Sequence, residues 1–578
     1  MESKTFNLLD ESWIRVVRTN SKENTLSLKD VFIHAHEYAD LSGELPAQDI
    51  AMLRFLLAVL HAVFARVDET GAEAPLKERK DAYKRWKTLW DLGHFPEKPI
   101  LDYLERWRSR FDLFDPIHPF WQVPAAKDAT TSESAKLNGE ILKSGNPHKY
   151  RIFSSRTGEE KDTLSFAEAA RWLLFTNAFD DAGVKASPQE KRMNKKLVSA
   201  GKGWLGDLGL ISAKGDTLFE TLLLNLILLE PGKKPWKSCT PIWEREESGK
   251  GVREEVFRPQ HDQAALLTWQ SRRLLLCREG DTVTGVHRVA GDLFLAQKDE
   301  RAKDMFAEQM TMWKPNRKKR GKETIVDGYL PKPHDRSRRL WHDFASLTAK
   351  SEAESDGKNN HAPGIVSWTQ QLIEEELLPE TGYLCFRIVS VSYDNNGSSI
   401  VDSFEDSLTF HRNLLTKLGN AWMERIEAEV KDCGKLANCI ADLTIHLHYA
   451  EAGKKEGKDV KGEEARLREQ AKEQFYYRID IPFREWLRSL EPAQGEEREK
   501  DWRETAYRIA EQLGKELVSQ AGPVAFRGRM ISVENNGDKE DSKRNTKKGG
   551  QEKEFYSAAK ESRIFKNRLN KWKRGEDI

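Results

Sequence analysis

A short polar run in the last third of the chain carries residue types that can recognise a nucleic acid. The run is Asp394-Asn395-Asn396-Gly397-Ser398, and it follows an apolar stretch, Tyr383 to Val391, that is typical of a buried β-strand. The pattern from Asp402 onward indicates a helix. Amide and hydroxyl groups both donate and accept hydrogen bonds, as contact with a base edge requires, and glycine suits a sharp turn. We therefore predict a tight strand-to-helix turn whose residues 395–398 can reach a ligand, as a wedge or a reader would.

A second candidate for DNA contact lies earlier in the chain. Gly183 would let the backbone approach a groove floor closely, and Lys185 would supply a cation to a phosphate. Glycine often does no more than turn a chain, so a purely structural role for this loop stays open.

Three segments are rich in cations. They are a loop from Val184 to Lys202, a denser loop from Trp313 to Lys322, and the helical C-terminal segment from residue 541 onward, which holds twelve Lys or Arg against six Asp or Glu. In that last segment four cations can lie off the apolar stripe and line one face that could contact a nucleic-acid backbone: Arg563, Lys566, Lys573 and Arg574. A solvated surface is the alternative interpretation of each segment.

Sequence signatures of a catalytic site are weaker than those of nucleic-acid contact. Three His-Asp pairs, beginning at His261, His334 and His342, are compatible with a metal-dependent nuclease, but further ligands at fixed spacing cannot be assembled around them. The sequence has no P-loop, no nucleophile elbow and no dinucleotide fingerprint. We expect no cofactor and no metal centre.

Composition indicates a protein with a real core and no overall basic character. The 578 residues include 17 tryptophans, 38% are hydrophobic, and the formal net charge is only +1, so phosphate contacts must come from local patches. The five cysteines never occur at CxxC spacing, which favours a reducing cytoplasm. The apolar run from Ile50 to Val67 contains Arg54 and His61 and is predicted to be a buried helix, and the short polar stretch from Met1 to Phe6 is not a signal peptide.

The elements that position these residues fall into two parts. Residues 1–400 mix predicted strands and helices, including a helix opened by a Ser165-x-x-Glu168 capping box, and contain a long aperiodic segment from Pro124 to Lys149. Residues 401–578 carry four apolar stripes at helical spacing. The predicted fold is therefore α+β, a large mixed α/β N-terminal domain followed by a four-helix bundle, with the boundary near residue 400.

Five short stretches in a fixed order also resemble a known family. They are Asn7 to Ile14, Leu45 to Leu60, the HPFWQ stretch at 118–122, Asp216 to Leu226, and Tyr393 to Leu408. Together they resemble the large subunit of the type I-E CRISPR surveillance complex Cascade, the CasA family. The resemblance implies a subunit that is not an enzyme, in a cytoplasmic ribonucleoprotein complex of antiviral defence, with no membrane contact.

The resemblance also implies a function and partners. Such a subunit contacts the other Cascade subunits and the crRNA 5′ handle, reads the protospacer-adjacent motif (PAM) in target double-stranded DNA, starts strand separation and R-loop formation, and recruits a helicase-nuclease. Carried over by position, the family's glycine loop is similar to Gly183 with Lys185, its crRNA-handle loop to Phe153 and Ser155, and its minor-groove lysine to Lys303.

Two positions depart from the family's pattern. The strand-separating wedge falls on 396–398, and Gly397 stands where other members carry glutamine. Only Cys277 remains of a cysteine cluster that some members carry, so no zinc is expected. Two other functions stay open: a stand-alone metal-dependent nuclease, and a purely architectural subunit without DNA contact.

Overall fold

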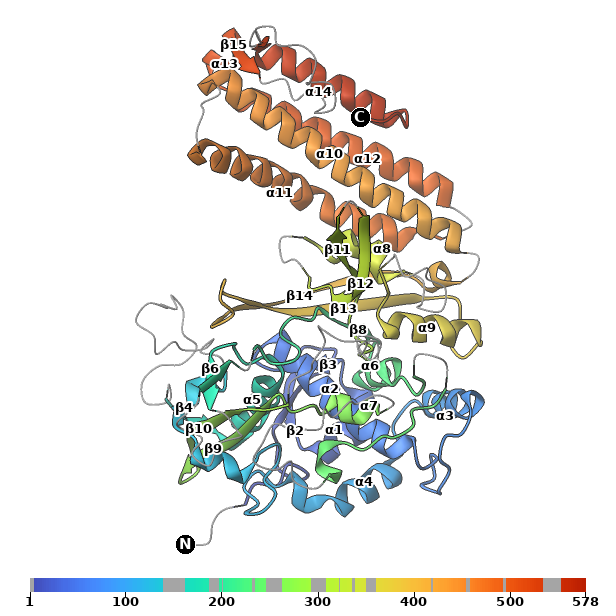
Figure 1. Cartoon of the computed structure of the whole chain (residues 1–578). Helices are drawn as coiled ribbons and strands as arrows, with labels where there is room; N and C mark the ends of the chain where they lie inside the picture. The colour runs from blue at the N-terminus through green and yellow to red at the C-terminus, as the bar shows by residue number, and fades with distance from the viewer. Residues whose placement is uncertain are drawn as a thin grey trace. The chain divides into compact units, whose positions relative to one another are not determined.

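The computed structural model divides into two compact units, each described here by itself (Figure 1). The first comprises Met1–Glu380 and Leu384–Leu408, and the second comprises Thr381–Tyr383 and Thr409–Ile578. The structure describes residues 5–138, 162–186, 197–199, 201–230, 234–245, 262–292, 308–321, 323–334, 338–349, 360–416, 419–453, 458–491, 495–533 and 552–578.

Helices of the first unit gather around one long buried helix. That helix, α2 (Pro46–Phe64), begins with proline at its first turn, where the missing N–H costs nothing. It is long and apolar enough to cross a membrane, yet 94% of its most apolar window is buried inside the protein. The other helices of this unit are α1 (Leu28–Ile33), α3 (Arg79–Leu92), α4 (Glu97–Arg106), α5 (Phe166–Phe179), α6 (Leu218–Asn225), α7 (Gln263–Leu267), α8 (Phe344–Leu347) and α9 (Gly364–Glu374).

The described strands of the first unit form four small sheets. A three-stranded sheet has the order β2 (Glu23–Leu26), β1 (Ile14–Val17), β3 (Asp40–Leu41). A six-stranded sheet is built around β10 (Thr282–Ala290), with β4 (Thr131–Glu133), β5 (Leu164–Ser165), β6 (Val184–Ala186), β7 (Leu197–Ser199) and β9 (Arg272–Glu279). The third is the two-stranded ribbon of β11 (Trp313–Arg320) and β12 (Glu323–Pro331). The fourth has the order β14 (Ile400–His411), β13 (Tyr383–Tyr393), β8 (Leu210–Lys214).

An aromatic cluster fills the core beneath α2. The ring of Phe55 lies 5.5 Å from that of Phe120, 5.7 Å from that of Trp243 and 5.8 Å from that of Trp121, centroid to centroid and edge to face. Such pairs stabilise a core beyond the burial of their area. Through this cluster, α2 packs against the loop that follows α4 and against the segment near residue 243.

The capping box predicted at the start of α5 is confirmed. The Glu168 N–H donates to the Ser165 hydroxyl oxygen, and the Ser165 N–H donates to the Glu168 carboxylate at 2.9 Å. These two bonds satisfy backbone donors that a helix start otherwise leaves unpaired.

Three predicted elements differ in the structure. The loop predicted from Val184 to Lys202 contains the paired strands β6 and β7. Residues 400–411 form strand β14 and not a helix, so the polar tip closes a β-hairpin between β13 and β14. Residues 313–320 form strand β11 and not a loop. The segment 124–138 contains two short 3-10 helices and β4, whereas the notably polar stretch after it, 139–149, lies outside the described residues.

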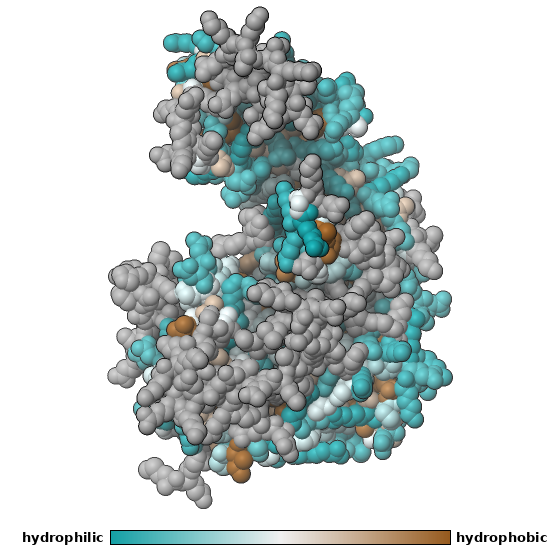
Figure 2. Space-filling model, in the orientation of Figure 1, coloured by the Kyte–Doolittle hydropathy of each residue, from teal (hydrophilic) through white to brown (hydrophobic). Residues whose placement is uncertain are grey.

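The second unit is a helix bundle, and the α+β class is therefore confirmed. Its long helices are α10 (Asn420–Ala452), α11 (Lys458–Ser489), α12 (Gly495–Gln520) and α14 (Ala558–Lys573). The short α13 (Pro523–Arg527) and a hairpin of β15 (Arg529–Val533) and β16 (Glu552–Tyr556) lie between α12 and α14 in the chain. The unit boundary falls inside β14, between Leu408 and Thr409. On the face seen in Figure 2, the described surface is mostly hydrophilic.

Candidate nucleic-acid interface

The tip of the β13–β14 hairpin is a turn fixed by one aspartate. The Asp394 carboxylate accepts hydrogen bonds from the Ser398 N–H at 2.7 Å and from the Ser398 hydroxyl at 2.8 Å. The Gly397 N–H donates to the Asp394 carbonyl at 2.9 Å, and φ at Gly397 is +68°. Glycine adopts this left-handed conformation without the Cβ clash that other residues meet.

Two asparagines present their amides at this tip. Asn395, Asn396 and Ser398 are exposed, whereas Gly397 is buried. The Ser398 hydroxyl is engaged by Asp394, while the Asn395 and Asn396 side chains make no hydrogen bond within the described part of the chain. These two amides are therefore the groups available to a ligand.

Backbone atoms join the tip to the glycine loop, residues 180–183. The loop follows α5, and its Ala182 N–H donates to the Gly397 carbonyl at 2.7 Å. A Cβ built on Gly397 would lie 3.3 Å from the Ala182 Cβ and 3.1 Å from the Lys202 Cε. Two segments far apart in the sequence thus form one surface, which we call the loop–tip surface (residues 180–183 and 394–399).

A buried charge cluster supports the loop from behind. Asp180 is fully buried, and its carboxylate accepts hydrogen bonds from Arg272 at 2.6 Å and from Arg288 at 2.7 Å, with the Lys185 ammonium 3.3 Å away. Burial by itself would raise the pKa of Asp180, but Arg288, Lys185 and Arg272 outweigh that effect and hold the pKa well below its ordinary value. The cluster fixes the end of α5 and the start of the loop.

Lys185 belongs to this cluster, which corrects its expected role. Only 3% of its side chain is exposed, and its ammonium lies 2.7 Å from the Asp181 carboxylate and donates to the Gly183 carbonyl at 2.9 Å. As folded, the ammonium is unavailable to a phosphate because it is buried and already bonded. Its position instead stabilises the loop on which Gly183 lies.

Lys202 lies beside the tip. Its ammonium lies 4.7 Å from the centre of the Tyr393 ring and 2.5 Å from the Asp207 carboxylate. Tyr393 is itself anchored, because its hydroxyl donates to the Phe179 carbonyl at 2.7 Å, and burial raises the pKa of that phenol well above its usual value. A cation–π contact at this range contributes about 0.5–1 kcal/mol on a surface.

The basic run after Trp313 lies on a ribbon. Lys314, Lys319 and Arg320 are exposed on β11 and form no ion pair within the described residues. On β12, Ile325 and Val326 pair with Lys318 and Arg317 and are 39% and 37% exposed. This run is therefore an exposed cationic surface of the first unit.

The four predicted cations of the C-terminal helix are all exposed, but they differ in pairing. Lys573 lies 2.6 Å from Glu504, and Arg574 lies 2.7 Å from Glu576. Arg563 and Lys566 have no such partner among the residues that the structure describes. Only two of the four cations are thus free to neutralise a phosphate without first breaking an ion pair.

Comparison with known proteins identifies the family. The family model for the CRISPR-associated protein Cse1 matches residues 7–513. This chain belongs to the Cse1 family. A CasA/Cse1 protein of Thermus thermophilus is 32% identical over 282 residues, so the match spans 48% of this chain and only 50% of that relative.

Two solved structures extend the likeness over nearly the whole chain. The crystal structure of Thermobifida fusca Cse1 superposes with a TM-score of 0.75 at 26% identity, covering 99% of both chains. A chain of a CRISPR RNA-guided surveillance complex superposes with a TM-score of 0.64 at 16% identity, covering 98% of this chain and all of that one, and thus shares the fold.

Three expected contact residues of this Cse1 family member lie outside the described residues. They are Phe153 and Ser155, for the crRNA handle, and Lys303, for the minor groove. They remain predictions.

The described residues do not bring together the ligands that a catalytic metal ion requires. No cluster of three or more His, Cys, Asp or Glu could hold a metal ion among those residues. His334 and Asp343, from two different His-Asp pairs, lie 3.4 Å apart, and Asp343 also pairs with Lys332 at 2.7 Å. All five cysteines are free thiols, and burial raises the pKa of Cys439 to about 11.

Sequence reasoning missed the residues that build the loop–tip surface from beneath. These are Asp180, Arg272, Arg288 and Lys202. Arg272 follows the Trp269-Gln270-Ser271 run, and Lys202 ends the basic loop, but nothing in their local sequence indicates that tertiary contacts bring them to one place.

Proposed function

We propose that this chain is the non-catalytic large subunit of a type I-E CRISPR RNA-guided DNA surveillance complex, and that its loop–tip surface reads the PAM and starts strand separation. Membership of the Cse1 family supports the first part, as does the shared fold with a chain of an RNA-guided surveillance complex. The observation that carries the second part is the 2.7 Å bond from the Ala182 N–H to the Gly397 carbonyl. It holds both predicted DNA-binding segments in one rigid surface.

The chemistry of this surface suits a short and degenerate readout. The exposed amides of Asn395 and Asn396 can each donate to and accept from a base edge. The minor groove offers acceptors that A·T and T·A share, so a reader of that groove tolerates several PAM variants. In such complexes base pairing with the guide reads the target, while the protein reads only the flank.

The remaining partners follow from the same proposal. Other Cascade subunits and the crRNA 5′ handle hold the chain in the complex, with Phe153 and Ser155 as the handle contacts and Lys303 as a groove contact. Exposed Arg563 and Lys566 guide the displaced strand along the bundle. A helicase-nuclease recruited to the complex degrades the target.

A substitution in the glycine loop tests the proposal. A Cβ at Gly183 would lie 2.7 Å from the Asp181 carboxylate oxygen, so Gly183→Asp adds both crowding and like charge. We expect complex assembly to survive and binding of PAM-bearing duplex in a gel shift to weaken by about tenfold or more. Gly434→Asp is the matched control, because a Cβ there meets nothing within 4 Å. Equal affinity of Gly183→Asp and wild type would remove this loop from the DNA site.

A further inference from the structure

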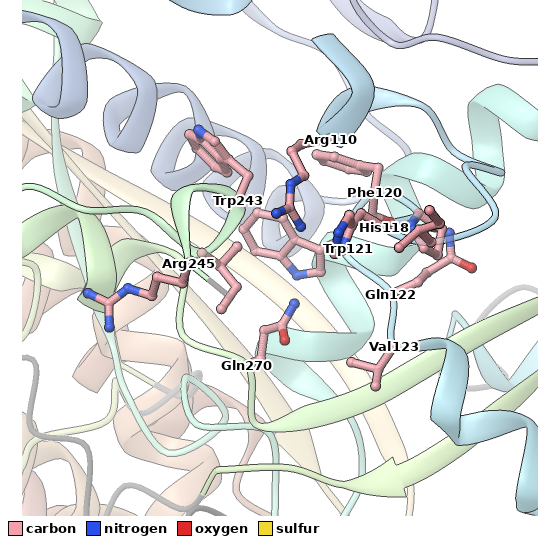
Figure 3. A pocket seen from close by; sticks show the side chains of 12 residues that line it. Arg110, His118, Phe120, Trp121, Gln122, Val123, Trp243, Arg245 and Gln270 are labelled. Atoms are coloured by element: carbon pink, nitrogen blue, oxygen red, sulfur yellow. Dashed lines mark hydrogen bonds between the residues drawn. The ribbon is translucent and has the colours of Figure 1, made fainter. Parts of the chain in front are cut away.

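A small cavity in the first unit has no part in the surface described above. It is partly open and has a volume of about 50 Å³ between the loop after α4, the 3-10 turn at Ile242–Glu244 and Gln270. One water needs roughly 10–15 Å³ by the same measure, so the space suits a group of a few heavy atoms. Figure 3 shows Arg110, Trp121 and Gln270 around it.

Trp121 holds a costly backbone conformation at the cavity wall. The Gln122 N–H donates to the Pro119 carbonyl at 3.1 Å and closes a four-residue turn, in which Trp121 has φ of +59°. Bulky side chains rarely adopt this region, at a cost of about 1–3 kcal/mol. Ring contacts hold the indole there, with centroids 5.8 Å from Phe55 and 5.6 Å from Phe120.

The indole N–H of Trp121 is buried and has no partner. Only 8% of Trp121 is exposed, and its Nε1 makes no hydrogen bond in the structure. An unpaired buried donor costs about 1–3 kcal/mol, so a structure that retains one at a cavity wall points to an acceptor that occupies the cavity. The neighbouring Trp243 contrasts with it, because its Nε1 donates to the Tyr103 hydroxyl at 2.8 Å.

Other lining groups are also unpaired and can donate. The Arg110 guanidinium, the His118 ring and the Gln270 amide make no hydrogen bond or ion pair within the described residues. Two other polar lining groups are already engaged: Gln122 donates to the Leu113 carbonyl and accepts from the Leu276 N–H, and Arg245 pairs with Asp262. Each unpaired group at the cavity can therefore donate a hydrogen bond, and one of them, Arg110, is a cation.

We propose that this cavity is a binding site for a small oxyanion, a carboxylate or phosphate group, held by the Arg110 guanidinium and the Trp121 indole N–H. Charge-assisted bonds from arginine to such groups are short and strong, and bidentate where both oxygens are reached. The buried Gln270 amide supplies a further donor, and the aromatic lining lowers the local polarity, which strengthens each bond.

Titration of the purified full-length chain tests the site. With 5-fluorotryptophan incorporated, one ¹⁹F resonance, assigned as the one that Trp121→Phe removes, should shift saturably with phosphate or with acetate but not with chloride at equal ionic strength. The anion that saturates at the lower concentration identifies the preferred group. The unfolding temperature should rise with the same anion over the same range.

Two arginine variants distinguish the site from general anion effects. Arg110→Gln should raise the dissociation constant by about tenfold or more. Arg106→Gln, which removes an exposed arginine on α4 outside the cavity, should leave it unchanged. The proposal is overturned by a wild-type resonance that neither anion moves, which would leave a cavity filled by water alone. It is also overturned by equal shifts in wild type and Arg110→Gln, which would show that Arg110 does not hold the anion.

Discussion

Asp180 is the residue on which the loop–tip surface depends most. It is a fully buried carboxylate between three cations. Removing one partner of a buried ion pair leaves charge uncompensated and typically costs about 3–5 kcal/mol. We therefore expect Asp180→Asn to lower the stability of the first unit by an amount of this order, measured as the midpoint of urea unfolding.

The matched control for that substitution is Asp207→Asn. Asp207 also pairs with a lysine, Lys202, but 67% of its side chain is exposed, and such pairs contribute about 0–1 kcal/mol. Equal shifts of the midpoint in the two variants would show that the Asp180 cluster does not hold the loop.

A second buried carboxylate predicts a pH dependence of stability. Burial raises the pKa of Asp49 to about 7, with Asp40 and Glu405 acting in the same direction and the Gly43 N–H and Arg387 opposing them. Because this folded pKa lies above the unfolded value of about 3.9, the folded state binds the extra proton between these values. The contribution of Asp49 is therefore full below about pH 4 and is lost as the pH rises through 7.

The neutral isostere should remove that dependence. Asp49→Asn keeps an oxygen that can accept the Gly43 N–H bond, now 2.7 Å, and should be more stable than wild type at pH 8 by up to about 4 kcal/mol. The difference should shrink as the pH falls, and at pH 4 the two proteins should be similar. Urea midpoints at the two pH values measure this, and a difference that is the same at both would contradict the assignment.

At the scale of elements, the β13–β14 hairpin decides how the tip can act. Asn396 offers a free amide, whereas the Ser398 hydroxyl is bonded to Asp394. Opening the first base pair costs on the order of a few kcal/mol, so loss of a contact made in the opened state slows opening. We expect Asn396→Ala to slow it more than Ser398→Ala, measured by 2-aminopurine fluorescence beside the PAM in the assembled complex. Opening by Asn396→Ala at the wild-type rate would exclude the tip as the wedge.

Gly397→Gln should not restore a glutamine wedge in this hairpin. The backbone at Gly397 has φ of +68°, and a Cβ there would lie 3.1 Å from Lys202. A left-handed glutamine costs about 1–2 kcal/mol, so we expect weaker PAM-duplex binding and slower opening than wild type. The same fluorescence assay measures it, and faster opening would show that the hairpin adjusts.

The four cations at the C-terminal helix α14 differ in whether they form an ion pair with a glutamate. Arg563→Ala with Lys566→Ala should flatten the dependence of R-loop stability on salt by about two phosphate contacts. Lys573→Ala with Arg574→Ala should change it less, because both side chains already pair with glutamates. Equal slopes for both double variants and wild type, over a KCl series, would favour a merely solvated surface.

Sequence patterns predicted some elements and missed others for physical reasons. The capping box at Ser165 is a local interaction, and the structure confirms it. Phe404 and Leu408 are four residues apart, a spacing that fits one face of a helix. They lie instead on strand β14, where Leu408 and Phe410, two residues apart, are both buried. Strand β11 could not be predicted from its sequence, because the residues from Lys314 to Arg320 are mostly cations and show no apolar alternation. Its extended conformation depends on pairing with β12.

At the scale of the whole molecule, the family and the α+β class were predictable from ordered short motifs, whereas the candidate site was predictable only in part. The tip and the glycine loop were identified, but their contact was not, because a backbone bond between distant segments leaves no residue-specific signal. The burial of Lys185 was missed for the same reason, since a lysine near a glycine has the same local sequence whether its ammonium faces water or carboxylates.

The bond between Ala182 and Gly397 is made entirely by main-chain atoms. This bond between the two segments therefore does not depend on which side chains lie beside it. The side chains of Asn395 and Asn396 make no hydrogen bond to the rest of the described chain. If the loop–tip surface reads the PAM as proposed, its base preference and its backbone geometry depend on separate atoms. Where viruses alter the sequence that flanks their targets, substitution of these two asparagines would change which flanking sequence is accepted. The backbone geometry of the loop–tip surface would stay the same.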